Sequence, residues 1–174
     1  MSCGFTLFDT AIGRCGVAWR DDVLVAVQLP EATDGQTRDR LLRRAPEARE
    51  LEPPVVIAAA KAAITGLLRG EPIDLSTIPL AMDDVPPFHR RVYDVARTIG
   101  PGSTLTYGEV ARRLGDAGAA RAVGQALGRN PFPIVVPCHR VLAAGGRSGG
   151  FSAHGGVATK RRLLAIEAGQ PVLS

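Results

Sequence analysis

A change of sequence pattern about halfway along the chain most limits the folds open to it. In the first half, the runs Gly16–Arg20 and Val23–Leu29 have the composition of β-strands, and Asp21-Asp22 between them is typical of a two-residue hairpin turn. In the second half, the apolar residues recur at helical spacing. This order predicts an α+β fold: a small N-terminal sheet-and-helix lobe over residues 1–85, then a helical lobe over residues 86–174.

The rest of the first half contains two predicted helices and a connector. A charged stretch at Thr37–Arg44 indicates a short helix, and Val55–Arg69 has apolar residues at helical spacing followed by Gly70, a common residue just past a helix end. Residues 71–87 contain four prolines and little periodicity, which predicts an extended connector. Nothing in this half indicates a particular chemistry.

The second half has the pattern of a winged-helix or helix-turn-helix lobe. One buried helical stripe is expected at Phe88, Val92, Val95 and Ile99. Thr106 followed by Glu109 matches the capping box, which predicts the start of a helix running through Leu114. A glycine-containing turn and a second helix, about 119–128, complete a helix-turn-helix pattern, which many proteins that do not bind DNA also share.

The second of these helices is unusual for one that reads bases. Most of its residues are alanine or glycine, and its polar side chains, four residues apart on one face, are Arg121, Gln125 and Arg129. Few long side chains allow little base reading in the major groove, whereas small residues permit close approach to the minor groove. The alanines could also be helix formers that pack against the preceding helix.

Charge and cysteine content restrict the class of protein. Residues 1–85 have a net charge of −4 and residues 86–174 a net charge of +8, which favours a polyanionic partner for the second half, although an arginine-rich composition could produce the same surface. The first residues lack a secretory signal, no apolar run is long enough to span a bilayer, and three scattered cysteines do not form a disulfide framework. We expect a cytoplasmic protein in a reducing compartment.

The run Pro137-Cys138-His139-Arg140 is the strongest indication of chemistry. The apolar residues 134–136 before it predict a short buried strand that Pro137 ends. A thiol held there beside an imidazole and a guanidinium has the neighbours that convert cysteine into a nucleophilic thiolate. A buried, unreactive cysteine is the alternative that these four residues alone leave open.

Several motifs of the second half, in order and spacing, resemble the O6-alkylguanine-DNA alkyltransferases. They are Arg121-Ala122-Val123-Gly124, Asn130-Pro131, Pro137-Cys138-His139-Arg140-Val141, Gly155-Gly156, Lys160 and Leu163-Leu164-Ala165-Ile166-Glu167. The first half matches only in its general plan. The resemblance implies a monomer that binds double-stranded DNA through the minor groove, flips the alkylated nucleotide out and transfers its alkyl group irreversibly to Cys138. The substrates implied are O6-alkylguanine and O4-alkylthymine, with no cofactor.

The resemblance also implies a role for each matching residue. His139 would take the thiol proton through a water, and Glu167 would orient the imidazole. Tyr107 would donate a proton to the leaving base, and Lys160 would support the cysteine segment. Arg121 would enter the base stack in place of the flipped nucleotide. With Arg121, we expect the DNA-binding residues to be Gln125, Arg129, Asn130 as a hinge, Arg140 and Ser152.

Each of these residues also has a simpler interpretation. Glu167 could be a surface carboxylate, Lys160 part of a solvated basic face, Tyr107 a packing residue and Asn130 a turn residue before proline. The chain departs from the family pattern at Gly149–Gly156, which is about two residues longer than usual and has Phe151 where many members have tyrosine. Cys3 and Cys15 lack nearby histidines, so we expect no structural metal.

Three other functions remain as alternatives. A non-catalytic protein that recognises alkylated DNA would have the same fold, but it would lack the acceptor cysteine. A Cys-His hydrolase would not need the helix-turn-helix or the basic second half. A winged-helix transcription regulator would need more base-reading side chains on the second helix.

Overall fold

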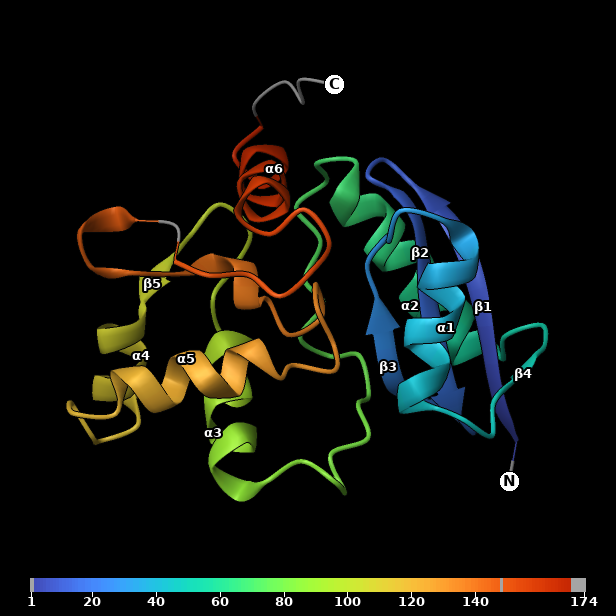
Figure 1. The fold of residues 1–174 in the computed structure, drawn as a ribbon, viewed down its shortest axis with the longest axis horizontal. Coiled ribbons are helices and arrows are strands. Elements are labelled where there is room, and N and C mark those ends of the chain that lie inside the picture. Colours follow the sequence, from blue (N-terminus) through green and yellow to red (C-terminus); the bar gives the residue numbers. More distant parts are fainter. Residues whose placement is uncertain (1, 148, 170–174) are drawn as a thin grey trace. The chain divides into compact units, whose positions relative to one another are not determined.

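The computed structural model describes residues 2–147 and 149–169 of the chain (Figure 1). These residues form two compact units. The N-terminal unit comprises the chain up to Ala81 together with Pro131–Val135, and the C-terminal unit comprises Met82–Asn130 and the chain from Val136 onward. The predicted α+β fold, with a sheet-and-helix lobe before a helical lobe, is confirmed. The sequence-based division at residues 85 and 86 did not include the return of 131–135 to the first unit.

A four-stranded sheet with the strand order β3-β2-β1-β4 forms the centre of the N-terminal unit. Its strands are β1 (Cys3–Thr10), β2 (Gly13–Arg20), β3 (Val23–Gln28) and the short β4 (Arg49–Glu50). The hairpin of β2 and β3 is antiparallel and pairs Arg20 with Val23 across the predicted turn, so that prediction is confirmed. The prediction omitted β1, which pairs antiparallel with β2 along its whole length and parallel with β4.

The two helices of this unit, α1 (Asp34–Arg44) and α2 (Val55–Leu68), contact opposite faces of the sheet (Figure 1). Side chains alternate between the two faces of a strand. Phe5 on β1 packs in a buried cluster with Leu41 of α1. Phe8, three residues along, faces the other way, and Lys61 of α2 places its Nζ 5.9 Å from the Phe8 ring centroid. Both predicted helices are present, and Gly70 follows α2 with a φ of 95°.

The residues between α2 and the next helix form no regular element, as the prolines predicted. They attach to the sheet by a bridge between Leu24 and Leu80, and the Ala81 N–H donates to the Leu24 carbonyl at 2.8 Å. The part of the chain that the structure describes contains no helix with the length and apolar character needed to cross a membrane.

Three helices in mutual contact form the core of the C-terminal unit: α3 (Pro87–Ala96), α4 (Tyr107–Arg113) and α5 (Ala120–Gly128). α4, a turn at Gly115 and α5 form the predicted helix-turn-helix. The capping box at the start of α4 is complete, because Glu109 N–H donates to Thr106 Oγ1 and Glu109 Oε1 accepts from Thr106 N–H. This cap fixes Tyr107 at the first position of the helix.

α5 is attached to α3 by a buried tyrosine. The Tyr93 hydroxyl donates to the Ala126 carbonyl at 2.7 Å, and the Tyr93 side chain is 1% exposed. Of the predicted stripe, Val92 is buried and Phe88 and Val95 are partly buried on α3. Ile99, also predicted on this helix, is buried but lies beyond the helix end at Ala96. The side of α5 that carries Ala126 is therefore packed against α3.

The prediction of a strand over residues 134–136 is wrong. Ile134 and Val135 form a turn, in which the buried Ile134 has a φ of 75°, and Val136 is a single β-bridge residue outside any strand. A β-branched side chain rarely adopts this left-handed conformation, so the turn is strained at Ile134. A short 3-10 helix, Cys138–Arg140, follows directly, and then β6 (Val141–Leu142) pairs parallel with β5 (Leu105–Thr106). A second 3-10 turn, Ala144–Gly146, and helix α6 (Val157–Glu167) complete the unit.

Candidate functional site

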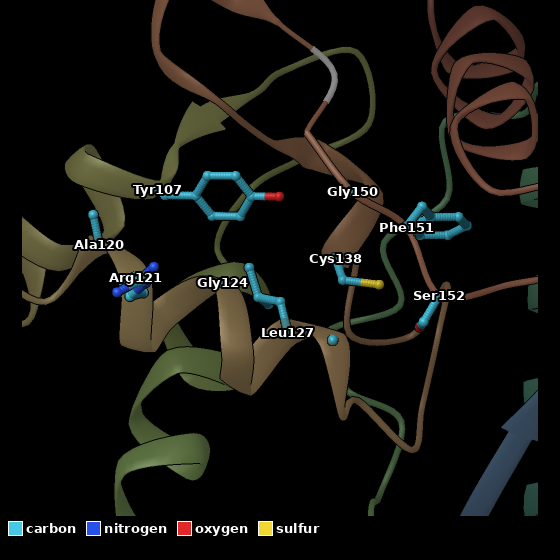
Figure 2. A pocket seen from close by; sticks show the side chains of 10 residues that line it. Tyr107, Ala120, Arg121, Gly124, Leu127, Cys138, Gly150, Phe151 and Ser152 are labelled. Carbon is cyan, nitrogen blue, oxygen red and sulfur yellow. The ribbon is translucent and has the colours of Figure 1, made fainter.

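Cys138 lies at the start of the 3-10 helix, where it is partly exposed and lines a cavity of about 510 Å³. All residues around this cavity belong to the C-terminal unit: Tyr107, Ala120, Arg121, Gly124, Leu127, Gly128, Cys138, Gly150, Phe151 and Ser152. Figure 2 shows the Tyr107 ring and Cys138 above helix α5, with the Gly150–Ser152 segment beside them. Cys138 is thus the cysteine that a bound molecule in this cavity would meet.

The surroundings of Cys138 favour the neutral thiol at rest. Burial raises the pKa of the thiol above its ordinary value. A hydrogen bond with the Asn130 side chain, the charge of Lys160, and the backbone N–H groups of Cys138 and His139 oppose that rise. Nucleophilic attack by this thiol therefore requires a base to remove its proton, while Lys160 and Asn130 favour the resulting thiolate.

His139 is a buried imidazole in which one ring nitrogen contacts a carboxylate. Its side chain is 0% exposed, and its Nε2 lies 2.6 Å from Oε1 of Glu167. Its Nδ1 is buried and has no hydrogen-bond partner among the described residues. Because Nε2 faces a carboxylate, the neutral ring holds its proton on Nε2 and keeps Nδ1 as an acceptor. Burial lowers the pKa of His139 below its ordinary value, although Glu167 opposes this, so the ring is neutral near pH 7.

Glu167, at the last residue of α6, is an internal carboxylate and not a surface one. Its side chain is 4% exposed. Burial would raise the pKa of this carboxyl, but hydrogen bonds from His139 and Arg140 and their charges outweigh burial and lower the pKa to about 2. The carboxylate is therefore ionised at every pH near neutrality.

The position of Arg140 differs most clearly from the sequence-based prediction of the site. The prediction placed it on DNA, but its side chain is 7% exposed and points into the unit. Its Nε donates to Glu167 Oε2 and its Nη2 to Glu167 Oε1, both at 2.8 Å, and its Nη1 donates to the Ile99 carbonyl at 2.6 Å. Consecutive residues of a 3-10 helix point about 120° apart, which explains why Cys138 faces the cavity while Arg140 faces α6.

Lys160, on the first turns of α6, is also buried, at 0% exposed, and not part of a solvated basic face. Its Nζ donates to the Val141 carbonyl at 2.7 Å and lies 3.5 Å from the Gly150 carbonyl. The same Nζ lies 5.7 Å from the Tyr107 ring centroid. Lys160 thus connects the segment after Cys138, the far wall of the cavity and Tyr107.

Tyr107 lines the cavity opposite Cys138 (Figure 2). Burial and the nearby Cys138 raise the pKa of its phenol, so it is protonated near neutral pH and can donate a proton. The backbone of Gly149, with a φ of 70°, passes directly over the phenol: a Cβ at this position would lie 2.7 Å from the Tyr107 hydroxyl oxygen. The sequence alone does not predict this role of Gly149, since a glycine in a glycine-rich loop gives no sign of what it packs against.

The polar residues predicted on α5 are exposed. Arg121, Gln125 and Arg129 all face solvent, and Arg121 also lines the cavity and an adjoining groove of about 570 Å³ next to α4. Ser152 is exposed and lines the cavity, in agreement with an accessible position. Asn130, by contrast, is 8% exposed and donates from Nδ2 to the Val136 carbonyl at 2.8 Å. Asn130 therefore holds the two ends of the 131–135 segment together and is not positioned on the surface.

No group of three or more potential metal-ligating His, Cys, Asp or Glu side chains occurs within residues 2–147 and 149–169. Cys15 is buried, and burial raises the pKa of its thiol to about 11, which makes it unreactive near neutral pH. Cys3 lies on β1, in the other unit from the cavity.

Comparison with known proteins gives consistent results. Residues 87–169 match the family described as "6-O-methylguanine DNA methyltransferase, DNA binding domain". A methylated-DNA–protein-cysteine methyltransferase of Methanothermobacter thermautotrophicus is 40% identical over 87% of this chain and 78% of its own length. The protein of the same name from Mycolicibacterium paratuberculosis is 38% identical over 91% and 88%.

The fold agrees with solved structures of the same kind. The crystal structure of Mycobacterium tuberculosis OGT in complex with DNA matches with a TM-score of 0.78 at 32% identity, covering 97% of this chain and 95% of that one. The O6-methylguanine-DNA methyltransferase from Pyrococcus kodakaraensis matches with a TM-score of 0.72 at 26% identity, covering 95% and 98%.

Proposed function

Because this chain belongs to the methylated-DNA–protein-cysteine methyltransferase family, we propose that Cys138 is the residue to which it transfers an alkyl group from O6 of guanine in DNA. The observation that supports this assignment is the position of Cys138. It is the one cysteine among the described residues that both lines the cavity and adjoins the buried pair of His139 and Glu167. The chain is then a DNA-repair protein, and the lesion itself supplies the alkyl group.

His139 acts as the base. Its neutral Nδ1 accepts the thiol proton, relayed by one water molecule, and Glu167 stabilises the imidazolium that forms through the 2.6 Å contact with Nε2. The thiolate gains support from Lys160 and from the Asn130 side chain. Removal of the proton by His139 suits a thiol whose resting pKa is raised, because the thiol loses its proton only when the substrate is in place.

The transfer is a displacement at the alkyl carbon. The bond from Cys138 Sγ to that carbon forms as the bond between the carbon and O6 breaks, and guanine leaves with the electron pair. Tyr107 donates a proton to the leaving base and later recovers one through solvent from His139. The product is a thioether, which thiol exchange does not reverse, so each molecule acts once. Because the same displacement applies at O4 of thymine, O4-alkylthymine is the second proposed substrate.

DNA reaches the site along α5. The helix presents small residues, with Ala120 and Gly124 lining the cavity, and its exposed Arg121, Gln125 and Arg129 lie on one side. Small side chains permit the close backbone approach that the minor groove requires. The cavity accepts a base only if the nucleotide leaves the stack, and Arg121, at the cavity edge, occupies the space it leaves. Ser152 contacts the flipped nucleotide from the opposite wall.

This function requires no cofactor and no second copy of the chain, so we propose a monomer. A reducing compartment such as the cytoplasm suits a protein with three free thiols, one of them the acceptor.

Intact-protein mass after incubation with excess duplex DNA containing one O6-methylguanine tests the proposal. The expected result is a single increase of about one methylene (~14 Da), mapped to Cys138 and saturating at one event per molecule. Lesion-selective binding without any mass change would mean a recognition protein that does not transfer. A mass change mapped to Cys3 or Cys15 would overturn the assignment of Cys138.

A further inference from the structure

The buried guanidinium of Arg140 has no role in the reaction described so far, although it contacts the same carboxylate as the base. It approaches Glu167 with two parallel hydrogen bonds of 2.8 Å, a geometry that fixes the plane of the carboxylate. Of the two carboxylate oxygens, Oε1 is shared with His139 Nε2. The third guanidinium nitrogen, Nη1, is attached to the Ile99 carbonyl.

We propose that Arg140 is a positioning residue, which holds the Glu167 carboxylate in the orientation that His139 requires and opposes premature protonation of His139. The proposal rests on the proposed function, because it assigns Arg140 to the base of that same reaction. It replaces the sequence-based assignment of Arg140 to the DNA surface.

Arg140 can orient Glu167 because the two side chains are attached to different elements. Glu167 is the last residue of α6, and a carboxylate at a helix end with only His139 as partner could rotate about its own bonds. Arg140 is fixed at both ends: its backbone belongs to the 3-10 helix next to His139, and its Nη1 is bound to Ile99. The two hydrogen bonds from the guanidinium therefore hold the carboxylate in a fixed position relative to the 3-10 helix.

The positive charge of Arg140 also affects the protonation of His139 at rest. The charged groups that act on His139 are Glu167 and Lys160 from α6 and Arg140 from its own 3-10 helix. Glu167 favours the imidazolium, whereas Arg140 and Lys160 disfavour it. An imidazole paired with an uncompensated buried carboxylate would hold a proton near neutral pH and could not accept the one from Cys138. Arg140 supplies the compensating positive charge at the carboxylate, through its two hydrogen bonds to Glu167.

Two variants separate the positioning and charge effects. Arg140→Met removes both the fork and the charge, and Arg140→Lys retains the charge but cannot make two parallel hydrogen bonds. Arg43→Met is the matched control, because Arg43 is an exposed arginine of α1 in the other unit. Each variant is first checked by its thermal unfolding curve and by its affinity for unmodified duplex DNA, which a buried Arg140 should not change.

The first measurement is the NMR titration of the His139 ring, which does not depend on alkyl transfer. The chain has three histidines, so His89 and His154 provide internal references. In Arg140→Met we expect the His139 midpoint to move up by about one pH unit, because a neighbouring positive charge is lost. In Arg140→Lys and Arg43→Met it should stay near the wild-type value. An unmoved His139 midpoint in folded Arg140→Met would overturn the charge effect.

The second measurement is the pH profile of the single-turnover transfer rate from O6-methylguanine duplex. We expect the acid limb of Arg140→Met to move to higher pH and its rate at pH 7 to fall by about tenfold or more, as for loss of an effective general base. Arg140→Lys should keep the wild-type acid limb but transfer more slowly. If Arg140→Met does not fold, Arg140→Lys still tests the positioning effect. A transfer rate of Arg140→Lys equal to that of the wild type would overturn that effect.

The two measurements also separate this proposal from the proposed function. If the wild-type protein transfers no alkyl group, the proposed function fails, and the histidine titration still shows whether Arg140 controls the base. If the wild-type protein transfers and both Arg140 variants match it in rate and profile, only the role of Arg140 is refuted.

Discussion

Glu167 Oε1 and His139 Nε2 lie 2.6 Å apart although 28 residues separate them in the sequence. Both side chains are almost fully buried, and the carboxylate also accepts two hydrogen bonds from Arg140. A buried carboxylate is stable as an anion only when such donors surround it. The end of α6 is thus joined to the residue next to Cys138 by a contact that depends on ionisation.

This contact predicts how stability depends on pH. The pKa of Glu167 is lowered in the folded state to about 2 from an ordinary value of 4.5, so the unfolded state binds the proton more readily. The contribution is fully present above about pH 4.5 and is lost as the pH falls from there towards 2, by at most about 3 kcal/mol. Urea unfolding between pH 7 and pH 2.5 measures it. Glu167→Gln should be less stable at pH 7 and lose less stability on acidification; an equal loss in both proteins would contradict the prediction.

Cys138→Ala should abolish alkyl transfer and leave DNA affinity nearly unchanged, because the thiol lies inside the cavity and the exposed arginines of α5 do not depend on it. Gel-shift affinity for duplex DNA and the intact mass after incubation with O6-methylguanine duplex give both values. Cys15→Ala, which changes a buried and unreactive thiol on β2, is the matched control for transfer. Residual transfer in Cys138→Ala would refute the acceptor assignment.

Arg121→Ala should slow transfer more in duplex than in single-stranded DNA. The side chain is exposed at the cavity edge, where it can occupy the place of the extruded nucleotide, and a single strand has no stack to fill. Single-turnover rates on the two substrates, with Gln125→Ala on the same face of α5 as a comparison, test the difference. Equal losses on both substrates would mean that Arg121 contributes only charge.

Gly149→Ala should impair transfer through Tyr107. A Cβ at position 149 would lie 2.7 Å from the Tyr107 hydroxyl oxygen, so the phenol or the loop must shift. Gly145 is the matched control: its φ of 75° resembles the 70° of Gly149, but no atom lies within 4 Å of its added Cβ. We expect Gly145→Ala to keep most of the transfer rate and Gly149→Ala to lose about tenfold or more, the scale of a displaced proton donor. Similar rates for the two alanine variants would show that the loop, and not the phenol, limits the reaction.

The sequence was sufficient for those elements whose signals are local. The hairpin at Asp21-Asp22, the capping box of Thr106 and Glu109, and helix α5 depend on residues a few positions apart, and the structure confirms them. β1 was missed because Cys3–Thr10 mixes glycine, threonine and aspartate with its apolar residues. Its strand character depends on pairing with β2 and β4, which no short window of sequence contains.

The turn at Ile134-Val135 and the direction of the Arg140 side chain could not be predicted, for a different reason. Three consecutive apolar residues suit a buried strand and a buried turn equally, and a φ of 75° at Ile134 contradicts the ordinary preference of a β-branched residue. Arg140 directly follows Cys138 and His139 in the sequence, but its partner Glu167 is 27 residues away. Which neighbour faces the cavity and which faces α6 is decided by the 3-10 helix and by the packing of α6.

The membership of Pro131–Val135 in the N-terminal unit has a consequence for any attempt to divide this protein. The chain leaves the C-terminal unit after Asn130 and returns at Val136, two residues before Cys138. A single cut between Ala81 and Met82 would therefore not yield two self-sufficient pieces. The second piece would retain Phe132, Ile134 and Val135, which are buried in the whole protein, without the residues that cover them. The segment Pro131–Val135, which lies shortly before Cys138, therefore belongs to the N-terminal unit, and a piece that begins at Met82 would separate this segment from the rest of that unit.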